Sequence, residues 1–165
     1  MLGPDNAIWD DGEWVGWDET NSHLGRLELQ ERFPNADLEL IPIFQDLLAT
    51  AQEYFVRTGR HLQVYGDIGE LFGAITYGIQ LHRNYAQGSD GRLGNDFVEV
   101  KTITPFKRNN IVELNLQRNF SKVLIVKISS EFEISGKLID RRSLPKAKGD
   151  NLRVDWSSLN DVGTA

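Results

Sequence analysis

Residues 88–103 read GSDGRLGNDFVEVKTI, and this stretch does most to decide the fold. Its second half, residues 97–103, alternates with the period of two that is typical of a β-strand. The alternation places Glu99 and Lys101 on one face, roughly 6.5–7 Å apart along the strand. The glycines of the first half predict a turn, so we expect a hairpin that folds Asp90 back beside Glu99.

The three polar residues of this hairpin have a chemistry in common. A carboxylate and an ammonium group in an apolar strand are costly to bury unless they serve a purpose. The carboxylates of Asp90 and Glu99, together with the carbonyl of Val100, offer the hard oxygen ligands that suit Mg²⁺ or Mn²⁺. Such a metal polarises a phosphoryl oxygen and activates a bound water, and Lys101 would position that water or stabilise developing charge. The pattern therefore predicts a site for phosphodiester hydrolysis.

Each of these residues also has an ordinary interpretation. Asp90 in the sequence Ser-Asp-Gly is natural as a solvated turn residue, and Glu99 with Lys101 would serve as an exposed pair on an edge strand. The conjunction of all three favours the site.

The arrangement resembles the PD-(D/E)xK, or restriction-endonuclease-like, superfamily of nucleases. The matching residues are Asp90, Glu99 and Lys101, with Val100 between the last two, and the resemblance covers roughly residues 60–145. One position departs from the pattern, because Ser89 rather than proline precedes Asp90. The resemblance implies a magnesium-dependent, endonuclease-like hydrolase that acts on nucleic acid, with DNA favoured over RNA. It also implies an α/β fold with a restriction-endonuclease-like core, in which a mixed central β-sheet is flanked by helices.

A helix expected from about Asp67 to Gly78 carries a further acid, Glu70. The superfamily often places a metal-binding glutamate on the helix before the hairpin, so the resemblance implies that Glu70 holds a second metal or the metal's water shell. A rival interpretation takes Asp67 as the N-cap and Glu70 as its capping-box partner, with no role in metal binding. Both interpretations stay open, and Gly69 on the same helix would allow another segment to approach closely.

The rest of the chain fits an α/β core of this kind. An amphipathic helix is expected over residues 41–58, ended by Gly59. Strands are expected over residues 111–117, 122–129 and 132–140, of which the second is apolar enough to be central. The predicted organisation is an acidic, Trp-rich extension over 1–40, a nuclease-like core over 41–148 and a polar, irregular C-terminal tail over 149–165.

The N-terminal extension has no consistent period. Residues 1–25 are expected to form a loop or short hairpin, and residues 24–32 a short helix or strand. Its tryptophans (Trp9, Trp14 and Trp17) are interpreted as anchors to the core or to another subunit.

Charge is unevenly distributed along the 165 residues, whose net charge is −6. Residues 1–59 contain 3 basic and 12 acidic side chains, whereas residues 60–149 contain 14 basic and 9 acidic ones. The part that resembles a nuclease is thus the basic part, which favours binding to a polyanion, although the asymmetry is also compatible with chance.

The loop after the expected lysine strand is the candidate contact to the nucleic-acid backbone. It offers Lys107, Arg108 and Asn109, with Arg118 expected nearby. The histidines (His23, His61 and His82) are dispersed, which argues against a histidine metal site. There is no cysteine, so disulfides, thiolate zinc sites and cysteine nucleophiles are excluded.

No stretch is apolar enough to span a membrane, and the first residues do not read as a signal peptide, so a cytoplasmic protein without membrane contact is expected. Its small size suggests a homodimer, or a partner subunit that supplies specificity. Two alternatives to a nuclease remain: a non-catalytic nucleic-acid- or protein-binding module with the same fold, and an interaction protein that works through its acidic N-terminal region.

Overall fold

The computed structural model describes residues 7–84 and 88–161. In chain order the elements are β1 (Ala7–Asp10), β2 (Glu13–Gly16), α1 (Trp17–Arg32), α2 (Leu40–Thr58), α3 (Tyr65–Tyr77), β3 (Gln80–Leu81), β4 (Gly91–Leu93), β5 (Asp96–Ile103), β6 (Ile111–Asn115), β7 (Lys122–Ile128), β8 (Ile134–Asp140), a 3-10 turn (Arg141–Ser143), β9 (Asn151–Asp155) and a second 3-10 turn (Trp156–Ser158).

A five-stranded sheet in the order β3-β4-β5-β7-β8 forms the centre of the body. β5 and β7 are parallel, with Val98 opposite Lys122, and every other neighbouring pair in this sheet is antiparallel. β7 lies inside the sheet between β5 and β8, and its apolar run, Val123 to Val126, is fully buried. The expected α/β class with a mixed sheet is therefore confirmed, while the restriction-endonuclease-like core remains a prediction.

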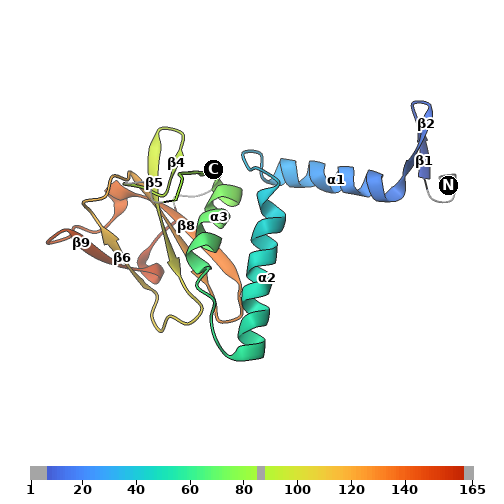
Figure 1. Cartoon of the computed structure of the whole chain (residues 1–165). Helices are drawn as coiled ribbons and strands as arrows, with labels where there is room; N and C mark the ends of the chain where they lie inside the picture. Colours follow the sequence, from blue (N-terminus) through green and yellow to red (C-terminus); the bar gives the residue numbers. More distant parts are fainter. Residues whose placement is uncertain (1–6, 85–87, 162–165) are drawn as a thin grey trace.

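Helices cover one face of this sheet. α3 packs against the even-numbered residues of β5 and β7, where Val98, Val100 and Leu124 are buried. α2 packs on α3 through Ala51, Tyr65 and other apolar side chains (Figure 1).

The opposite face is covered by a small sheet of β6 and β9. Leu114 and Val154 from this sheet pack against Ile103 and Ile125 of the central one. The expectation of flanking helices thus holds for one face only among the described elements. The expected irregular C-terminal tail is wrong for residues 151–155, because a short apolar alternation there supplies a strand that buries two residues, Leu152 and Val154.

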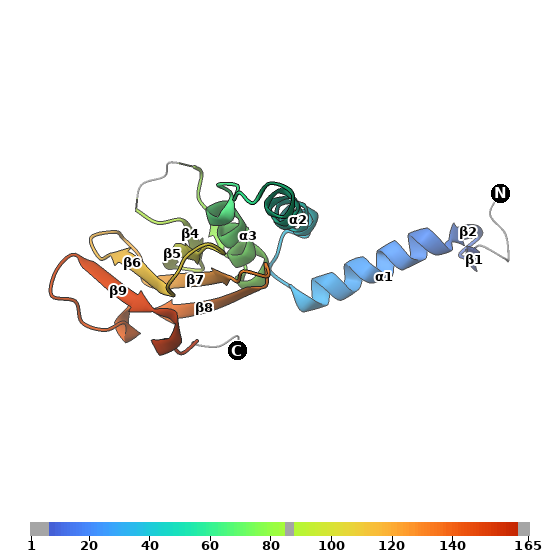
Figure 2. The same ribbon diagram turned by 90° about the horizontal axis from the view of Figure 1, so that it is seen from below.

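The N-terminal region forms an arm. The hairpin β1–β2 confirms one of the two forms expected for this region, and its turn places Asp11 and Gly12 at positive φ, 39° and 96°. Of the short helix or strand expected over residues 24–32, the structure has a helix, and it starts earlier, at Trp17, so α1 has 16 residues. Figures 1 and 2 show the hairpin and α1 projecting away from the body. The side chains of Trp9 and Trp14 lie outside the described part of the structure, and Trp17 is 45% exposed.

The two helices of the body begin and end on identifiable residues. α2 ends at Gly59, which has a left-handed backbone with φ of 66°, as expected from the sequence. α3 begins at Tyr65 rather than Asp67, so the expected capping box of Asp67 and Glu70 is wrong: both residues lie inside the helix. Tyr65 is buried and its hydroxyl lies 2.7 Å from His61 Nδ1, which explains the earlier start.

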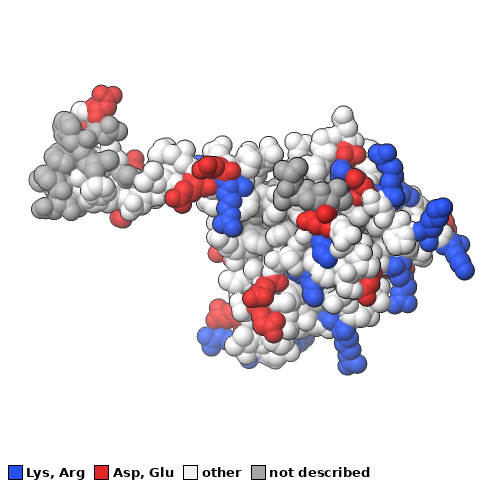
Figure 3. All heavy atoms as spheres, turned by 180° about the vertical axis from the view of Figure 1, so that it is seen from behind, with Lys and Arg blue, Asp and Glu red and all other residues white. Residues whose placement is uncertain are grey.

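Charge follows the division between arm and body. Figure 3 shows acidic side chains along the arm and lysine and arginine side chains on the side of the body away from it. No described helix is both long and apolar enough to cross a membrane.

Candidate functional site

The hairpin β4–β5 places Asp90 beside the middle of β5. β4 pairs with β5 only from Asp96 to Val98. The backbone N–H of Asp90 donates to the carbonyl of Val98 at 3.0 Å, so Asp90 continues the register and lies next to Glu99. The predicted return of Asp90 to Glu99 through a Gly-rich turn is confirmed.

Beyond Val98 one edge of β5 lacks a paired strand. From Glu99 to Ile103, β5 pairs with β7 on one side, and among the described residues no strand pairs with it on the other. The carboxylate of Asp90 fills part of this gap, because its Oδ2 accepts a hydrogen bond of 2.7 Å from the N–H of Val100. The open edge therefore holds a carboxylate in a fixed position.

Glu99 is buried, with 1% of its surface exposed, and it lies between two cations. Lys101 Nζ is 2.9 Å from Glu99 Oε1, and Arg118 Nε is 2.9 Å from Oε2. These are ion-pair distances, and neither oxygen is paired in hydrogen-bond geometry. Burial raises the pKa of Glu99 above its ordinary value, the charge of Asp90 adds to the rise, and Lys101 and Arg118 oppose it.

Arg118 occupies a different place from the one expected. It was grouped with the loop of residues 107–109 as a contact to nucleic acid, yet its guanidinium lies between the two carboxylates. Its Nη2 is 3.5 Å from Asp90 Oδ1, and its Nε also donates to the carbonyl of Gly88 at 3.0 Å. Sequence reasoning missed this because the turn from β6 to β7 carries Arg118 to the hairpin from a distant part of the chain.

Glu70 on α3 lies close enough to the same carboxylates for their charge to affect it. Burial raises its pKa, and the negative charges of Asp90, Asp67 and Glu99 raise it further. α3 lies very close to β5 here, since a Cβ atom on Gly69 would be 2.0 Å from Thr102 Oγ1. The expected close approach at Gly69 is thus present, and Glu70, Asp90 and Glu99 form what we call the acidic cluster.

The donor atoms of the acidic cluster suit a divalent cation in kind. Carboxylate oxygens are the ligands that Mg²⁺ and Mn²⁺ prefer. The two buried oxygens of Glu99 have no partner in hydrogen-bond geometry among the described residues, but each lies 2.9 Å from a cationic nitrogen. Among the described residues, however, no group of three His, Cys, Asp or Glu side chains is arranged to hold a metal ion. Asp90 and Glu99 would be the first ligands of such an ion, with Glu70 and the carbonyl of Val100 as further candidates.

The loop of residues 107–109 lies beyond the far end of β5, about 13 Å along the strand from Glu99. Lys107 Nζ donates to the carbonyl of Ile111, and Asn109 Oδ1 accepts from the N–H of Ile111 at 3.2 Å. Two of the three loop residues expected to bind nucleic acid therefore also stabilise the conformation of the loop. Arg108 is exposed.

His82 flanks the site, although no local sequence pattern indicates this. Its backbone N–H donates to the carbonyl of Asp90 at 2.9 Å, and its Nδ1 is 3.1 Å from the carbonyl oxygen of the buried residue Ser89. The pairing of Leu81 with Gly91 brings these residues together, and only knowledge of that register could have revealed it.

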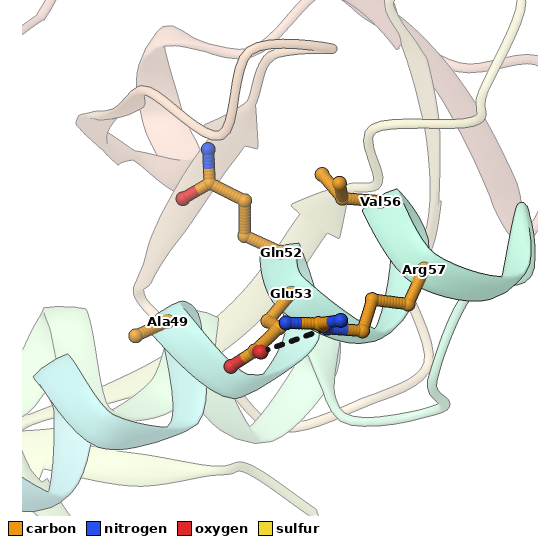
Figure 4. A pocket seen from close by; sticks show the side chains of 5 residues that line it. All are labelled: Ala49, Gln52, Glu53, Val56 and Arg57. Carbon is orange, nitrogen blue, oxygen red and sulfur yellow. Dashed lines mark hydrogen bonds and ion pairs between the residues drawn. The ribbon is translucent and has the colours of Figure 1, made fainter.

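A hollow elsewhere on the surface involves none of these residues. It lies on the outer side of α2, lined by Ala49, Gln52, Glu53, Val56 and Arg57 (Figure 4). An ion pair of 3.0 Å joins Arg57 to Glu53 across it, and both side chains are exposed. Nothing in its lining suggests chemistry.

No protein-family model matches this chain, and no curated protein is significantly similar to it in sequence. Any inference about function therefore rests on the acidic cluster and its two cationic neighbours, Lys101 and Arg118.

Proposed function

We propose that the protein is a metal-dependent nuclease that hydrolyses phosphodiester bonds of nucleic acid, with DNA favoured. One observation carries the proposal: Asp90 and Glu99 contact the same guanidinium, and Lys101 lies 2.9 Å from Glu99 on the same strand. Two acids and a lysine thus meet beside the edge of β5 that has no paired strand among the described residues.

The residues of the cluster have separable roles in this proposal. Asp90 and Glu99 would hold Mg²⁺ or Mn²⁺, which would supply charge neutralisation and a more acidic water. Lys101 is one-third exposed, so its ammonium group can reach both Glu99 and a bound phosphate. There it positions the attacking water or stabilises the charge that develops on the phosphoryl oxygens as the P–O bond breaks.

The substrate surface is the basic part of the chain. Arg108 at the exposed tip of its loop, with Lys107 and Asn109, is proposed to contact the phosphate backbone without reading sequence. Specificity would then come from a second copy of the chain or from a partner subunit.

A second candidate function is a non-catalytic module that binds nucleic acid or protein through the same fold. It is favoured by the charge balance around Glu99, whose carboxylate already has two cationic neighbours. The absence of a three-ligand metal group among the described residues points the same way.

Nicking of supercoiled plasmid DNA separates the two functions. The wild-type protein should nick DNA when Mg²⁺ is added and stop when EDTA removes it. Lys101→Ala should abolish nicking while the protein still folds and binds metal, with some loss of stability because buried Glu99 loses one of its two cations. Lys127→Ala on the adjacent strand should nick normally. Undiminished nicking by Lys101→Ala would refute the role of this lysine.

A further inference from the structure

Arg118 stands where a metal ion would be expected. Its guanidinium contacts Glu99 Oε2 at 2.9 Å and Asp90 Oδ1 at 3.5 Å. A single positive group thus bridges the two carboxylates that would be the first ligands of a divalent cation. Arginine keeps its charge at any physiological pH, so this contact does not depend on protonation.

The backbone that carries Arg118 is held in place by a second arginine. Arg141 Nη1 donates to the carbonyls of Arg118 and Phe120, at 3.0 and 3.1 Å, and its Nη2 donates to that of Leu116. Its guanidinium also lies 4.6 Å from the ring centre of Phe120. The turn between β6 and β7 is therefore fixed, and a change of partner by Arg118 needs only a rotation of its side chain, which is 34% exposed.

A divalent cation and this guanidinium would compete for the same two carboxylates. Glu99 has only two oxygens, both buried, and Lys101 already lies against one of them. A metal that binds Glu99 and Asp90 would repel a guanidinium at about 3 Å from the same atoms. The competition is reciprocal, so removing one cation must strengthen the binding of the other.

We propose that Arg118 is the resting counter-ion of Asp90 and Glu99, and that a divalent cation displaces its guanidinium toward a phosphate of the nucleic acid. The second half of this proposal rests on the proposed nuclease function. A planar guanidinium suits a phosphate because it can donate two parallel hydrogen bonds. Arg118 would thus neutralise the acids before the metal arrives and bind the substrate afterwards.

Calorimetric titration of Mn²⁺ and Mg²⁺ into the protein without nucleic acid tests the displacement. Arg118→Ala should bind metal about tenfold more tightly than the wild type, since no guanidinium competes. Arg153→Ala removes an exposed arginine from β9 and should leave metal affinity unchanged. Equal or weaker metal binding by Arg118→Ala would overturn the proposal.

The thermal stability of the same proteins provides a second readout. Without metal, Arg118→Ala should lose stability because Glu99 keeps its burial and loses a cation, and saturating Mg²⁺ should raise its Tm more than that of the wild type. If Arg118 had only a structural role, the variant would lose thermal stability and Mg²⁺ would not restore it.

An NMR titration tests the displacement in the wild-type protein itself, and a variant is needed only to assign the signal. The ¹⁵N–¹H signal of Arg118 Nε, assigned by its loss in Arg118→Lys, should shift as diamagnetic Mg²⁺ saturates the site. If the signal stays unchanged when the site is saturated with metal, the displacement of Arg118 is wrong and the proposed nuclease function is unaffected. If neither Mg²⁺ nor Mn²⁺ binds, both the displacement and the proposed nuclease function are wrong.

Discussion

Asp90 Oδ2 accepts a hydrogen bond of 2.7 Å from the backbone N–H of Val100, at the point where β4 has ended and no other described strand pairs with β5 on that side. The contact gives Asp90 a structural task besides any catalytic one, because an unpaired N–H at a partly buried strand edge is costly. Conservative replacement is therefore preferable to truncation at this position. Asp90→Asn keeps an oxygen that can accept this bond while lowering the charge of the acidic cluster.

Glu70 should make folding stability depend on pH. Burial and the charges of its acidic neighbours raise the pKa of Glu70 in the folded state above its ordinary value of 4.5. At a pH between the pKa of Glu70 in the unfolded state and its pKa in the folded state, the folded state binds more protons. Folding stability therefore falls as the pH rises through this range, and the loss is complete above the pKa of the folded state. Glu70→Gln cannot ionise and should have a Tm a few degrees above the wild type at pH 7 in EDTA.

This difference in Tm should shrink as the pH approaches 4.5 and below, where Glu70 is protonated in both states. Glu113→Gln on β6 changes an exposed glutamate and serves as the matched control. If the difference in Tm between Glu70→Gln and the wild type did not change with pH, the higher stability of the variant would have a cause other than the ionisation of Glu70.

The contact between α3 and β5 should tolerate no side chain at Gly69. An added Cβ would lie 2.0 Å from Thr102 Oγ1, so Gly69→Ala should destabilise the fold by about 1–3 kcal/mol through overpacking. Gly66→Ala on the same helix has nothing within 4 Å and should be neutral or stabilise by up to about 1 kcal/mol. Urea unfolding of the two variants measures the difference, and equal stabilities would mean that the helix can shift away from the strand.

Sequence reasoning succeeded where a pattern is local. The alternation of residues 97–103 placed Glu99 and Lys101 on one face of β5, and the glycines of the turn brought Asp90 to them. Likewise, the apolar run at residues 122–129 identified the central strand.

It failed where distant segments meet. The position of Arg118 depends on the course of the chain between β6 and β7, and that of β9 depends on its pairing with β6, so neither has a local signal beyond a few alternating residues. The start of α3 was misplaced for a related reason, since the contact of Tyr65 with His61 extends the helix beyond the acidic residue that looked like a cap.

Binding to nucleic acid should depend steeply on salt. If the basic part of the chain neutralises phosphates, the logarithm of affinity should fall with the logarithm of salt by about 0.9 for each phosphate contacted in duplex DNA. The double change Lys107→Ala with Arg108→Ala should reduce this slope and weaken binding equally for unrelated sequences. Fluorescence anisotropy with two unrelated duplexes measures both effects, and salt-independent binding would show that this loop is ordinary surface.

The N-terminal arm should be dispensable for the fold of the body. Figures 1 and 2 show the hairpin and most of α1 projecting away from the body, and the ion pair of 3.2 Å between Arg26 and Glu39 is exposed. Removing residues 1–25 should therefore leave the circular dichroism and the cooperative unfolding of the remainder intact. Loss of folding would mean that the tryptophans of the arm belong to the core, as one of the sequence interpretations had it.

An anomalous difference map from crystals grown with Mn²⁺ would show whether Asp90 and Glu99 form a divalent-metal site. We expect a peak within about 2.5 Å of carboxylate oxygens from both residues, with the Arg118 guanidinium moved off them. The peak should vanish in Glu99→Gln crystals grown in the same way. Saturating Mn²⁺ that leaves these carboxylates without a peak, and Arg118 still between them, would rule out the metal site.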